Sequence, residues 1–391
     1  MPARVDVADL ARRGTELLER LIGFDTTSRD SNLALIEFVE NYLGGHGVAS
    51  RRIVSPDGAK ANLLASVGPP AAGGIVLSGH TDVVPVDGQP WTSDPFTLTR
   101  RGDKLFGRGT CDMKGFIALA LAAVPDLVAA RPARPAHLAL SYDEEVGCLG
   151  APRLIAEMAR DLPAPALVIV GEPTSSALVG AHKGISLFEV IVRGREAHSS
   201  QTHLGVSAVM AAVRLMSVLD QAAARLEAEA EPHSPFVPPH ATLTIGIVHG
   251  GTAGNILARE CRFLFDVRAP AGADVGAMLR DFFSAVKTED AAIRSRCDGG
   301  VEVIRRADVP GFSMPRGGPA EALARRLTGD NGEPGAVSFA AEAGQFGGAG
   351  FPTVLCGPGS IDQAHQPDEF IAIEQMERGA ALLAAVVAEL T

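Results

Sequence analysis

Residues 75–82 read IVLSGHTD, a continuous apolar run that ends in a histidine and an aspartate. Two later stretches have the same form: HLALSYDEE at 137–145 and ALVIVGE at 166–172. Continuous apolar strands of this kind are typical of a parallel sheet covered by helices on both faces. We therefore expect an α/β fold, with a central, mostly parallel sheet flanked by helices.

The middle of the chain has a different pattern. Residues 185–192 (ISLFEVIV) alternate like a half-buried strand. The elements expected after it are helices at 206–230 and 275–286 and strands at 242–248, 261–268 and 301–306. Their order, β-α-β-β-α-β, is that of a ferredoxin-like unit.

The length of 391 residues is enough for two or three domains. We expect an α/β domain in two segments, 1–180 and 311–391. Between these segments the smaller α+β domain occupies 181–310. No internal repeat is evident in the sequence.

Composition and charge narrow the function classes. Hydrophobic residues make up 46% of the chain and charged residues 21%, which predicts a folded core. The net charge of −11 would not attract nucleic acid or an anionic membrane surface. The low aromatic content, 5%, also argues against a platform for stacking bases. We expect neither a nucleic-acid nor a membrane partner.

The cysteines and the N-terminal stretch bear on the compartment. The five cysteines are scattered and include no C-x-x-C pair, which is typical of reduced thiols in a cytosolic protein. The first residues lack the apolar region of an export signal and instead place leucines on one face of a helix. The expected location is the cytoplasm.

Acidic and histidine residues gather at the ends of the expected strands or open the helix near residue 114. These residues are His80, Asp82, Asp112, Glu144, Glu145, Glu172 and His365. In open α/β sheets, ligands bind at the carboxyl ends of the strands. So many carboxylates in one cleft would repel one another unless cations neutralised them. Imidazoles combined with carboxylates favour zinc or a similar metal, and the carboxylate count favours two ions over one.

Each of these residues also has a purely structural explanation. A single histidine after a strand is usually a hydrogen-bonded core or surface residue, and Glu144–Glu145 would ordinarily be a solvated pair. Asp112 could cap a helix. The metal hypothesis is favoured because all of them are expected at one edge of the sheet.

Seven stretches, taken in order, resemble the M20 family of dinuclear metallopeptidases and deacylases. They are SGHTDVVPV, GRGTCDMKGF, SYDEEVGCLGA, GEPT, GREAHSS, GGTAGNI and CGPGSIDQAHQPDEFI. The resemblance runs from about residue 17 to the last helix. It implies a catalytic domain interrupted by a ferredoxin-like lid that mediates dimerisation.

The resemblance also implies a ligand set. Asp112 would be the carboxylate that bridges two ions, zinc or alternatively cobalt. His80 and Glu172 would complete one site, and Glu145 and His365 the other. The family pattern further implies that the peptide bond after Asp112 is cis.

The other roles that the resemblance implies are catalytic or substrate-binding. Glu144 would be the general base, and the Asp82 carboxylate would orient the imidazole of His80. His198 would reach across a homodimer to stabilise the developing negative charge. Asn255 and Arg268 would bind substrate, with Arg268 gripping an α-carboxylate.

Within the family, the segment 339–346 (FAAEAGQF) is most similar to the acetylornithine deacetylases. Glu342 would then face the δ-ammonium of the substrate, although a surface carboxylate is the simpler explanation of that residue. Ala340 and Ala341 depart from the Gly-Thr that is common there. The alternatives are succinyl-diaminopimelate desuccinylase, a general N-acyl-amino-acid deacylase and, in a different class, a metal-free homologue that only binds a small molecule.

Overall fold

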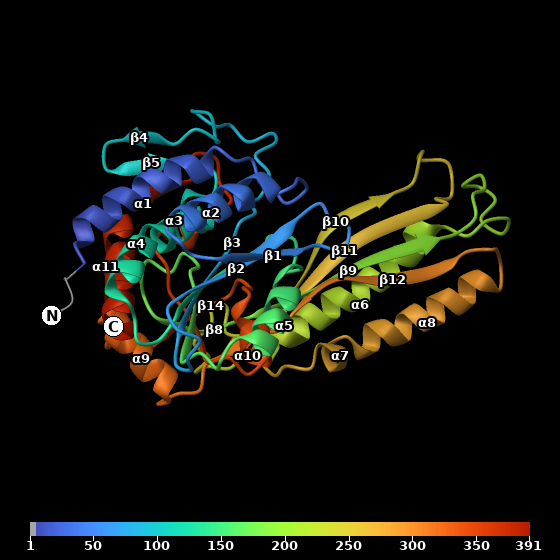
Figure 1. Ribbon diagram of the computed structural model, residues 1–391. Coiled ribbons are helices and arrows are strands. Elements are labelled where there is room, and N and C mark those ends of the chain that lie inside the picture. Colours follow the sequence, from blue (N-terminus) through green and yellow to red (C-terminus); the bar gives the residue numbers. More distant parts are fainter. Residues whose placement is uncertain (1–4) are drawn as a thin grey trace. The chain divides into compact units, whose positions relative to one another are not determined.

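The computed structural model describes residues 5–391 and divides the chain into two compact units (Figure 1). The first unit contains the residues up to 181 together with 312–335 and 341–391. The second unit contains 182–311 and 336–340. The short segment 336–340 therefore groups with the second unit, although it lies in the stretch 311–391 that was expected to belong to the α/β domain.

The main sheet has nine strands, and most of their residues belong to the first unit. They are β1 (Ser50–Val54), β2 (Ala61–Val67), β3 (Ile75–His80), β6 (Ala136–Ser141), β7 (Leu167–Val170), β8 (Val179–His182), β13 (Phe312–Ser313), β14 (Gly335–Val337) and β15 (Thr353–Leu355). Their order is β1-β2-β6-β3-β7-β15-β8-β13, with β14 also paired to β8. The central strands β6, β3, β7 and β15 are parallel, and β1, β2 and β8 pair antiparallel. The predicted fold class is confirmed, with a sheet that is mixed towards its margins.

Helices pack around this sheet. They are α1 (Val7–Ile22), α2 (Leu33–Gly45), α3 (Gly115–Ala122), α4 (Val124–Ala130), α5 (Ala151–Asp161), α9 (Pro319–Thr328), α10 (Ala343–Gly348) and α11 (Ile373–Leu390). All eight residues of α3 are buried, because it packs against α1, α11 and β3. This burial explains its uniformly apolar sequence, GFIALALA. The segment Thr110–Ala130 is apolar and long enough to cross a membrane, but 72% of its most apolar window is buried inside the protein, as in a core helix.

A small three-stranded sheet completes the first unit. It consists of β4 (Thr99–Arg101), β5 (Lys104–Phe106) and β16 (Phe370–Ala372), in the order β16-β5-β4. The sequence does not indicate this sheet, because strands of three residues are too short to show a periodic pattern. The pairing of β16 with β5 places the chain after His365 next to the chain before Asp112.

The second unit has a four-stranded antiparallel sheet in the order β10-β11-β9-β12. The strands are β9 (Gly184–Arg193), β10 (Thr242–Gly250), β11 (Glu260–Ala269) and β12 (Gly300–Val309). Along β11 every second side chain is buried, and this face packs on α6 (Ala208–Ala228) and α8 (Arg280–Arg294). The element order is the predicted β-α-β-β-α-β, apart from one interrupted helix.

That helix was predicted as a continuous element at 275–286. The structure has α7 (Val275–Met278) followed by α8, which continues to Arg294. Leu279 has φ −97° and ψ 10° and interrupts the helix. The mostly polar sequence after residue 286 predicts an earlier end of the helix, but the polar side of α8 is exposed and needs no apolar residues.

Candidate metal centre

His80 is the last residue of β3, where the parallel strand ends. Its ring is buried, and Nδ1 lies 2.9 Å from the main-chain oxygen of Asp82. A carbonyl oxygen can only accept a hydrogen bond, so Nδ1 carries the proton and donates it. In the neutral ring this leaves the lone pair on Nε2, which lies 2.9 Å from Oδ1 of Asp112.

Asp112 lies in a tight turn, Thr110–Lys114, that leads into α3. The turn begins after Gly109, whose φ of 83° is in the left-handed region that favours glycine. The Asp112–Met113 peptide bond is cis, as the family resemblance predicted. The two carboxylate oxygens of Asp112 face two imidazoles: Oδ1 faces His80, and Oδ2 lies 3.3 Å from Nε2 of His365.

The remaining residues of the cluster come from three loops. Glu145 follows β6, and its Oε2 lies 3.0 Å from Nε2 of His365. Glu172 follows β7 and is buried. Its Oε1 has no hydrogen-bond partner among the described residues. The structure therefore brings together His80, Asp112, Glu145, Glu172 and His365.

Burial and mutual repulsion disturb the ionisation of the carboxylates. Burial, followed by the charge of Asp112, raises the pKa of Glu145 to about 7 and that of Glu172 well above its usual value. Burial and the charge of Glu172 also raise the pKa of Glu144 well above its usual value. Burial works in the same direction on Asp112, but the hydrogen bonds from the two imidazoles lower its pKa. These groups cannot all be ionised at neutral pH without added positive charge.

The pKa values of the two imidazoles are raised as well, which favours their charged form. The hydrogen bonds to Asp112 and Glu145 raise the pKa of His365 to about 10. Burial opposes a charge on His80, but Asp112 and the surrounding carboxylates raise its pKa well above the usual value. A raised pKa favours the protonated ring, which places positive charge beside the carboxylates.

Two divalent cations, held by the same donor atoms, could also neutralise the carboxylates. One group is His80, Asp112 and Glu172, and the other is Asp112, Glu145 and His365; within each, the donor atoms lie within 4.8 Å of one another. Asp112 is common to both groups. The unpartnered Oε1 of Glu172 fits a ligand oxygen, because buried polar atoms otherwise find hydrogen bonds. Nitrogen and oxygen donors together suit zinc-like ions.

Asp82 holds the main chain beside this cluster. Its carboxylate accepts hydrogen bonds from the backbone N–H of Glu144 at 3.1 Å and of Glu145 at 3.2 Å, and from Ser28 Oγ at 2.7 Å. The His80 ring donates to the Asp82 carbonyl, and its Nδ1 also lies 3.7 Å from Oδ1 of the Asp82 carboxylate, the group that the family resemblance implies as the one orienting the ring. The Cys148 thiol donates to Oε1 of Glu144 at 3.3 Å.

Glu342 precedes α10 and is 1% exposed. Burial raises its pKa to about 7, against the lowering effect of the Ser141 and Ser78 hydroxyls. Its Oε1 has no hydrogen-bond partner among the residues that the structure describes. Ser78 and Ser141 belong to β3 and β6, so Glu342 lies beside the same two strands that precede the cluster.

The other predicted residues belong to the second unit. His198 and Asn255 are neighbours there, since Ser199 N–H donates to the Asn255 carbonyl at 2.9 Å and His198 pairs with Ile256. Both lie near the Glu260 end of β11, where Gly194 N–H donates to the Arg259 carbonyl. Arg268 is near the other end of β11, roughly 27 Å away at about 3.4 Å per residue. Its Nε lies 3.5 Å from Oδ1 of Asp266.

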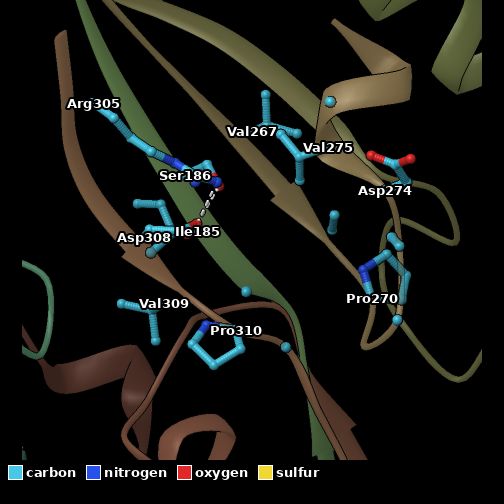
Figure 2. Close-up of a pocket in the computed structure, with 16 residues that line it drawn as sticks. Ile185, Ser186, Val267, Pro270, Asp274, Val275, Arg305, Asp308, Val309 and Pro310 are labelled. Atoms are coloured by element: carbon cyan, nitrogen blue, oxygen red, sulfur yellow. Dashed lines mark hydrogen bonds and ion pairs between the residues drawn. The ribbon is translucent and has the colours of Figure 1, made fainter. Parts of the chain in front are cut away.

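A pocket of about 570 Å³ in the second unit contains none of the predicted site residues (Figure 2). Its charged lining residues already have partners. Asp308 accepts from Ser186 Oγ at 2.8 Å and pairs with Arg305 at 2.6 Å. Asp274 caps α7 by accepting from Ala277 N–H at 3.0 Å. We assign no ligand to it.

A buried ion pair beside the cluster was not predicted from the sequence. Arg108 and Glu369 are each 1% exposed, and Arg108 Nη1 lies 2.7 Å from Glu369 Oε2. Both residues lie within the quoted stretches GRGTCDMKGF and CGPGSIDQAHQPDEFI. A charged residue inside a motif was the available signal, but only the fold shows that the two meet.

Comparisons with known proteins identify the family. Residues 76–389 match the model of peptidase family M20/M25/M40. The acetylornithine deacetylase of Proteus mirabilis (strain HI4320) is 35% identical over 356 residues, which cover 90% of this chain and 89% of that protein.

Two solved structures share the fold. An M20 family metallo-carboxypeptidase from Sulfolobus solfataricus has a TM-score of 0.76 at 16% identity, covering 96% of this chain and 98% of that chain. A dinuclear metal-binding M20 peptidase from Bacillus subtilis has a TM-score of 0.65 at 14% identity, covering 99% and 100%. The chain therefore belongs to peptidase family M20/M25/M40, and it is a metal-dependent hydrolase that acts on amide bonds.

Proposed function

We propose that the protein hydrolyses the amide bond of an N-acyl amino acid, and that this substrate is N2-acetyl-L-ornithine. The products would be L-ornithine and acetate, a step of arginine biosynthesis. The observation that carries the reaction class is the pair of donor groups that share Asp112, with Glu144 beside them. The substrate is suggested by the 35% identity to the Proteus mirabilis acetylornithine deacetylase.

His80, Asp112 and Glu172 would hold one ion, and Asp112, Glu145 and His365 the other. We propose zinc, with cobalt as the alternative that the same nitrogen and oxygen donors accept. Bound divalent ions polarise an amide carbonyl and lower the pKa of water towards neutrality. The carboxylate of Asp112 would bridge the two sites, since its two oxygens face different imidazoles.

Glu144 is the general base in this proposal. Its carboxylate would accept a proton from the attacking water and pass it to the departing amide nitrogen. Asp82 fixes the main chain of Glu144, and the Cys148 thiol contacts its Oε1. Asp82 would therefore position both the base and, through its carbonyl oxygen, the His80 ring.

The charges of N2-acetylornithine provide the basis for selectivity. Arg268 would hold the α-carboxylate, which a guanidinium can bind with two hydrogen bonds. Glu342 would accept the δ-ammonium, and its unpartnered, buried Oε1 supports this role. Ala340 and Ala341 offer no hydroxyl to the substrate, which leaves the carboxylate of Glu342 as the selective group.

We also propose a homodimer with shared active sites. Within one protomer, His198 and Asn255 lie near the opposite end of β11 from Arg268, so one small substrate could not contact all three. His198 and Asn255 of one protomer would instead complete the site of the other, with His198 donating to the amide oxygen as negative charge develops there. The edge strand β10 and helix α6 offer an apolar surface, with side chains 46–56% exposed: Met210, Val213, Ile247 and Val248.

Complementation between protomers tests the shared site. His198→Ala and Glu144→Gln protomers should each be inactive alone. After subunit exchange, a mixed dimer should contain one site with an intact His198 and an intact Glu144, so activity should return. Absence of recovery after exchange has been shown by mass spectrometry would contradict donation across the dimer.

The cytoplasm is the proposed location. The five cysteines are all free thiols in the structure, and four of them are buried. Unpaired thiols are usual in the reducing environment of the cytosol.

The substrate proposal is tested by a panel of N-acyl amino acids compared by kcat/KM. The panel should contain N2-acetylornithine, N-succinyl-diaminopimelate and N-acetyl amino acids with neutral side chains. We expect N2-acetylornithine to give the highest kcat/KM, chelation to abolish hydrolysis and zinc to restore it. A preference for the succinylated substrate would favour the desuccinylase alternative, and binding without hydrolysis would favour the small-molecule-binding alternative.

A further inference from the structure

A buried ion pair contacts the turn that carries Asp112. Arg108 and Glu369 are both 1% exposed, and the guanidinium of Arg108 also lies over the ring of Trp91 at 5.0 Å. Removing two charges from water is costly, so a buried pair is weak grounds for a role in stability alone. The contacts of the pair point to a different role.

The Glu369 carboxylate binds three backbone N–H groups of that turn. Its Oε1 accepts from Cys111 at 2.9 Å and from Asp112 at 3.2 Å, and its Oε2 accepts from Gly109 at 3.1 Å. Together with Arg108, these donors satisfy both carboxylate oxygens. The direction of the Asp112 side chain therefore depends on a carboxylate that is not itself in either donor group.

Arg108 is also connected to His365, through the side chain of Gln89. Arg108 Nη2 donates to Oε1 of Gln89 at 2.6 Å, and Nε2 of Gln89 donates to the main-chain oxygen of His365 at 2.9 Å. His365 has a φ of 62°, uncommon for a non-glycine residue, and its side chain is 52% exposed. Little packing surrounds this ring, so the main-chain bond from Gln89 matters for its placement.

We propose that Glu369, Arg108 and Gln89 form a positioning network that fixes the separation of Asp112 and His365. The network joins the backbone of Asp112, through Glu369, to the backbone of His365, through Gln89. It thereby sets the geometry of the donor group Asp112, Glu145 and His365. This inference rests on the proposed two-metal function. None of the three network residues touches substrate or metal in it.

The two arms of the network have different expected effects. The Gln89 arm reaches only His365, which belongs to one donor group. The Glu369 arm reaches Asp112, which belongs to both. Gln89→Ala should therefore weaken the binding of one ion, whereas Glu369→Gln should weaken the binding of both. Substitution of such supporting residues commonly costs about 10- to 100-fold in metal affinity.

A second buried carboxylate with similar partners, Glu321, offers a matched control. Glu321 is also a buried carboxylate of the first unit, and it accepts from a backbone N–H (Gly317, 2.8 Å) and from an arginine (Arg325, 2.7 Å). It lies on α9 and belongs to neither donor group. Glu321→Gln thus reports the effect of losing a buried carboxylate away from the cluster.

The experiment measures zinc affinity and stoichiometry by equilibrium dialysis for the wild type, Glu369→Gln, Gln89→Ala and Glu321→Gln. The visible absorption spectrum of the cobalt form reports ligand geometry independently of activity. We expect Gln89→Ala to lower the affinity for one ion about 10- to 100-fold and to change the absorption spectrum of the cobalt form. Excess zinc should restore much of its kcat, since Gln89 does not touch the reacting atoms. Glu321→Gln should change neither affinity, whatever its thermal stability.

The outcomes separate this inference from the proposed function. A wild type that binds no divalent ion would contradict both. A wild type with two ions, together with unchanged affinities and spectra in Gln89→Ala and Glu369→Gln, would overturn the network alone. Equal weakening in Glu321→Gln would also overturn it, because the effect would then be general. Gln89 is only partly buried, so its variant is expected to fold even if Glu369→Gln does not.

Discussion

The two ends of the central strands in the first unit carry buried histidines of opposite character. At the carboxyl end of β3, His80 lies among carboxylates, which raise its pKa despite its burial. At the amino end of β6, His137 contacts Ser66 through Nδ1, and burial lowers its pKa to about 4. The two strands are adjacent and parallel, with Val76 opposite His137 and His80 opposite Ser141.

This contrast shows that burial alone does not mark a functional histidine. Both rings are almost fully covered: His80 is 1% exposed and His137 is 2% exposed. The difference comes from the loops, because those at the carboxyl ends bring Asp112, Glu145 and Glu172 beside His80. Ligand sites of open α/β sheets occur at that end for the same topological reason.

The largest expected effect is a loss of turnover on substitution of Glu144, in a loop at the carboxyl ends of the central strands. Glu144→Gln should lower kcat by about 10²- to 10⁴-fold, because an amide cannot accept the proton that the carboxylate would take. Both ions should remain bound, since Glu144 is in neither donor group. Steady-state kinetics and metal analysis of the same sample check this, and full activity would contradict the role of general base.

A smaller effect, confined to one substrate class, is expected at Glu342. Leaving one member of a buried charge pair without its partner costs about 2–5 kcal/mol, or some 30-fold to several thousand-fold. Glu342→Gln should reduce kcat/KM by this factor for N2-acetylornithine and much less for an N-acetyl amino acid with a neutral side chain. The neutral substrate serves as the control. An equal loss on both substrates would remove Glu342 as the selective residue.

The smallest effect on activity is expected at the amino end. His137→Gln should leave kcat at pH 7 unchanged, because the residue is remote from the donor groups along its strand. It should instead change the acid stability of the fold. The folded pKa of about 4 lies below the unfolded value of about 6.5, so the folded state resists protonation.

The sign of that change follows from linkage. Stability contributed by neutral His137 is fully present above pH 6.5 and is lost as the pH falls towards 4. At 1.36 kcal/mol per pKa unit, the difference between 6.5 and about 4 amounts to at most about 3.4 kcal/mol. Urea unfolding at pH 7 and pH 4 should show a smaller acid loss in His137→Gln than in the wild type. Identical losses would show that His137 does not sense the pH.

Sequence patterns anticipated the fold class and the convergence of His80, Asp112, Glu145, Glu172 and His365. Both follow from local rules, because apolar runs mark the strands and parallel strands place their ends at one edge of a sheet. The functional roles of these residues came from the family resemblance and stay predictions.

Other features depend on contacts between distant segments and could not be predicted. Arg108 and Glu369 are 261 positions apart, and their pairing follows from the β5–β16 contact, which no periodic pattern signals. His80 Nδ1 lies 2.9 Å from the Asp82 carbonyl oxygen and 3.7 Å from its carboxylate, and no sequence pattern distinguishes these two contacts. The burial of Glu342 likewise depends on its position beside β3 and β6, which no local pattern indicates.

The number of divalent ions per protomer in the wild type and in Asp112→Asn tests the central claim most directly. Metal analysis after dialysis against a fixed free zinc concentration, with hydrolysis measured on the same samples, gives this number. We predict two ions in the active wild type, and loss of both metal binding and hydrolysis in Asp112→Asn, because Asp112 belongs to both donor groups. A wild type with no more than one ion at full activity, or an Asp112→Asn variant that retains two ions and full activity, would contradict the account.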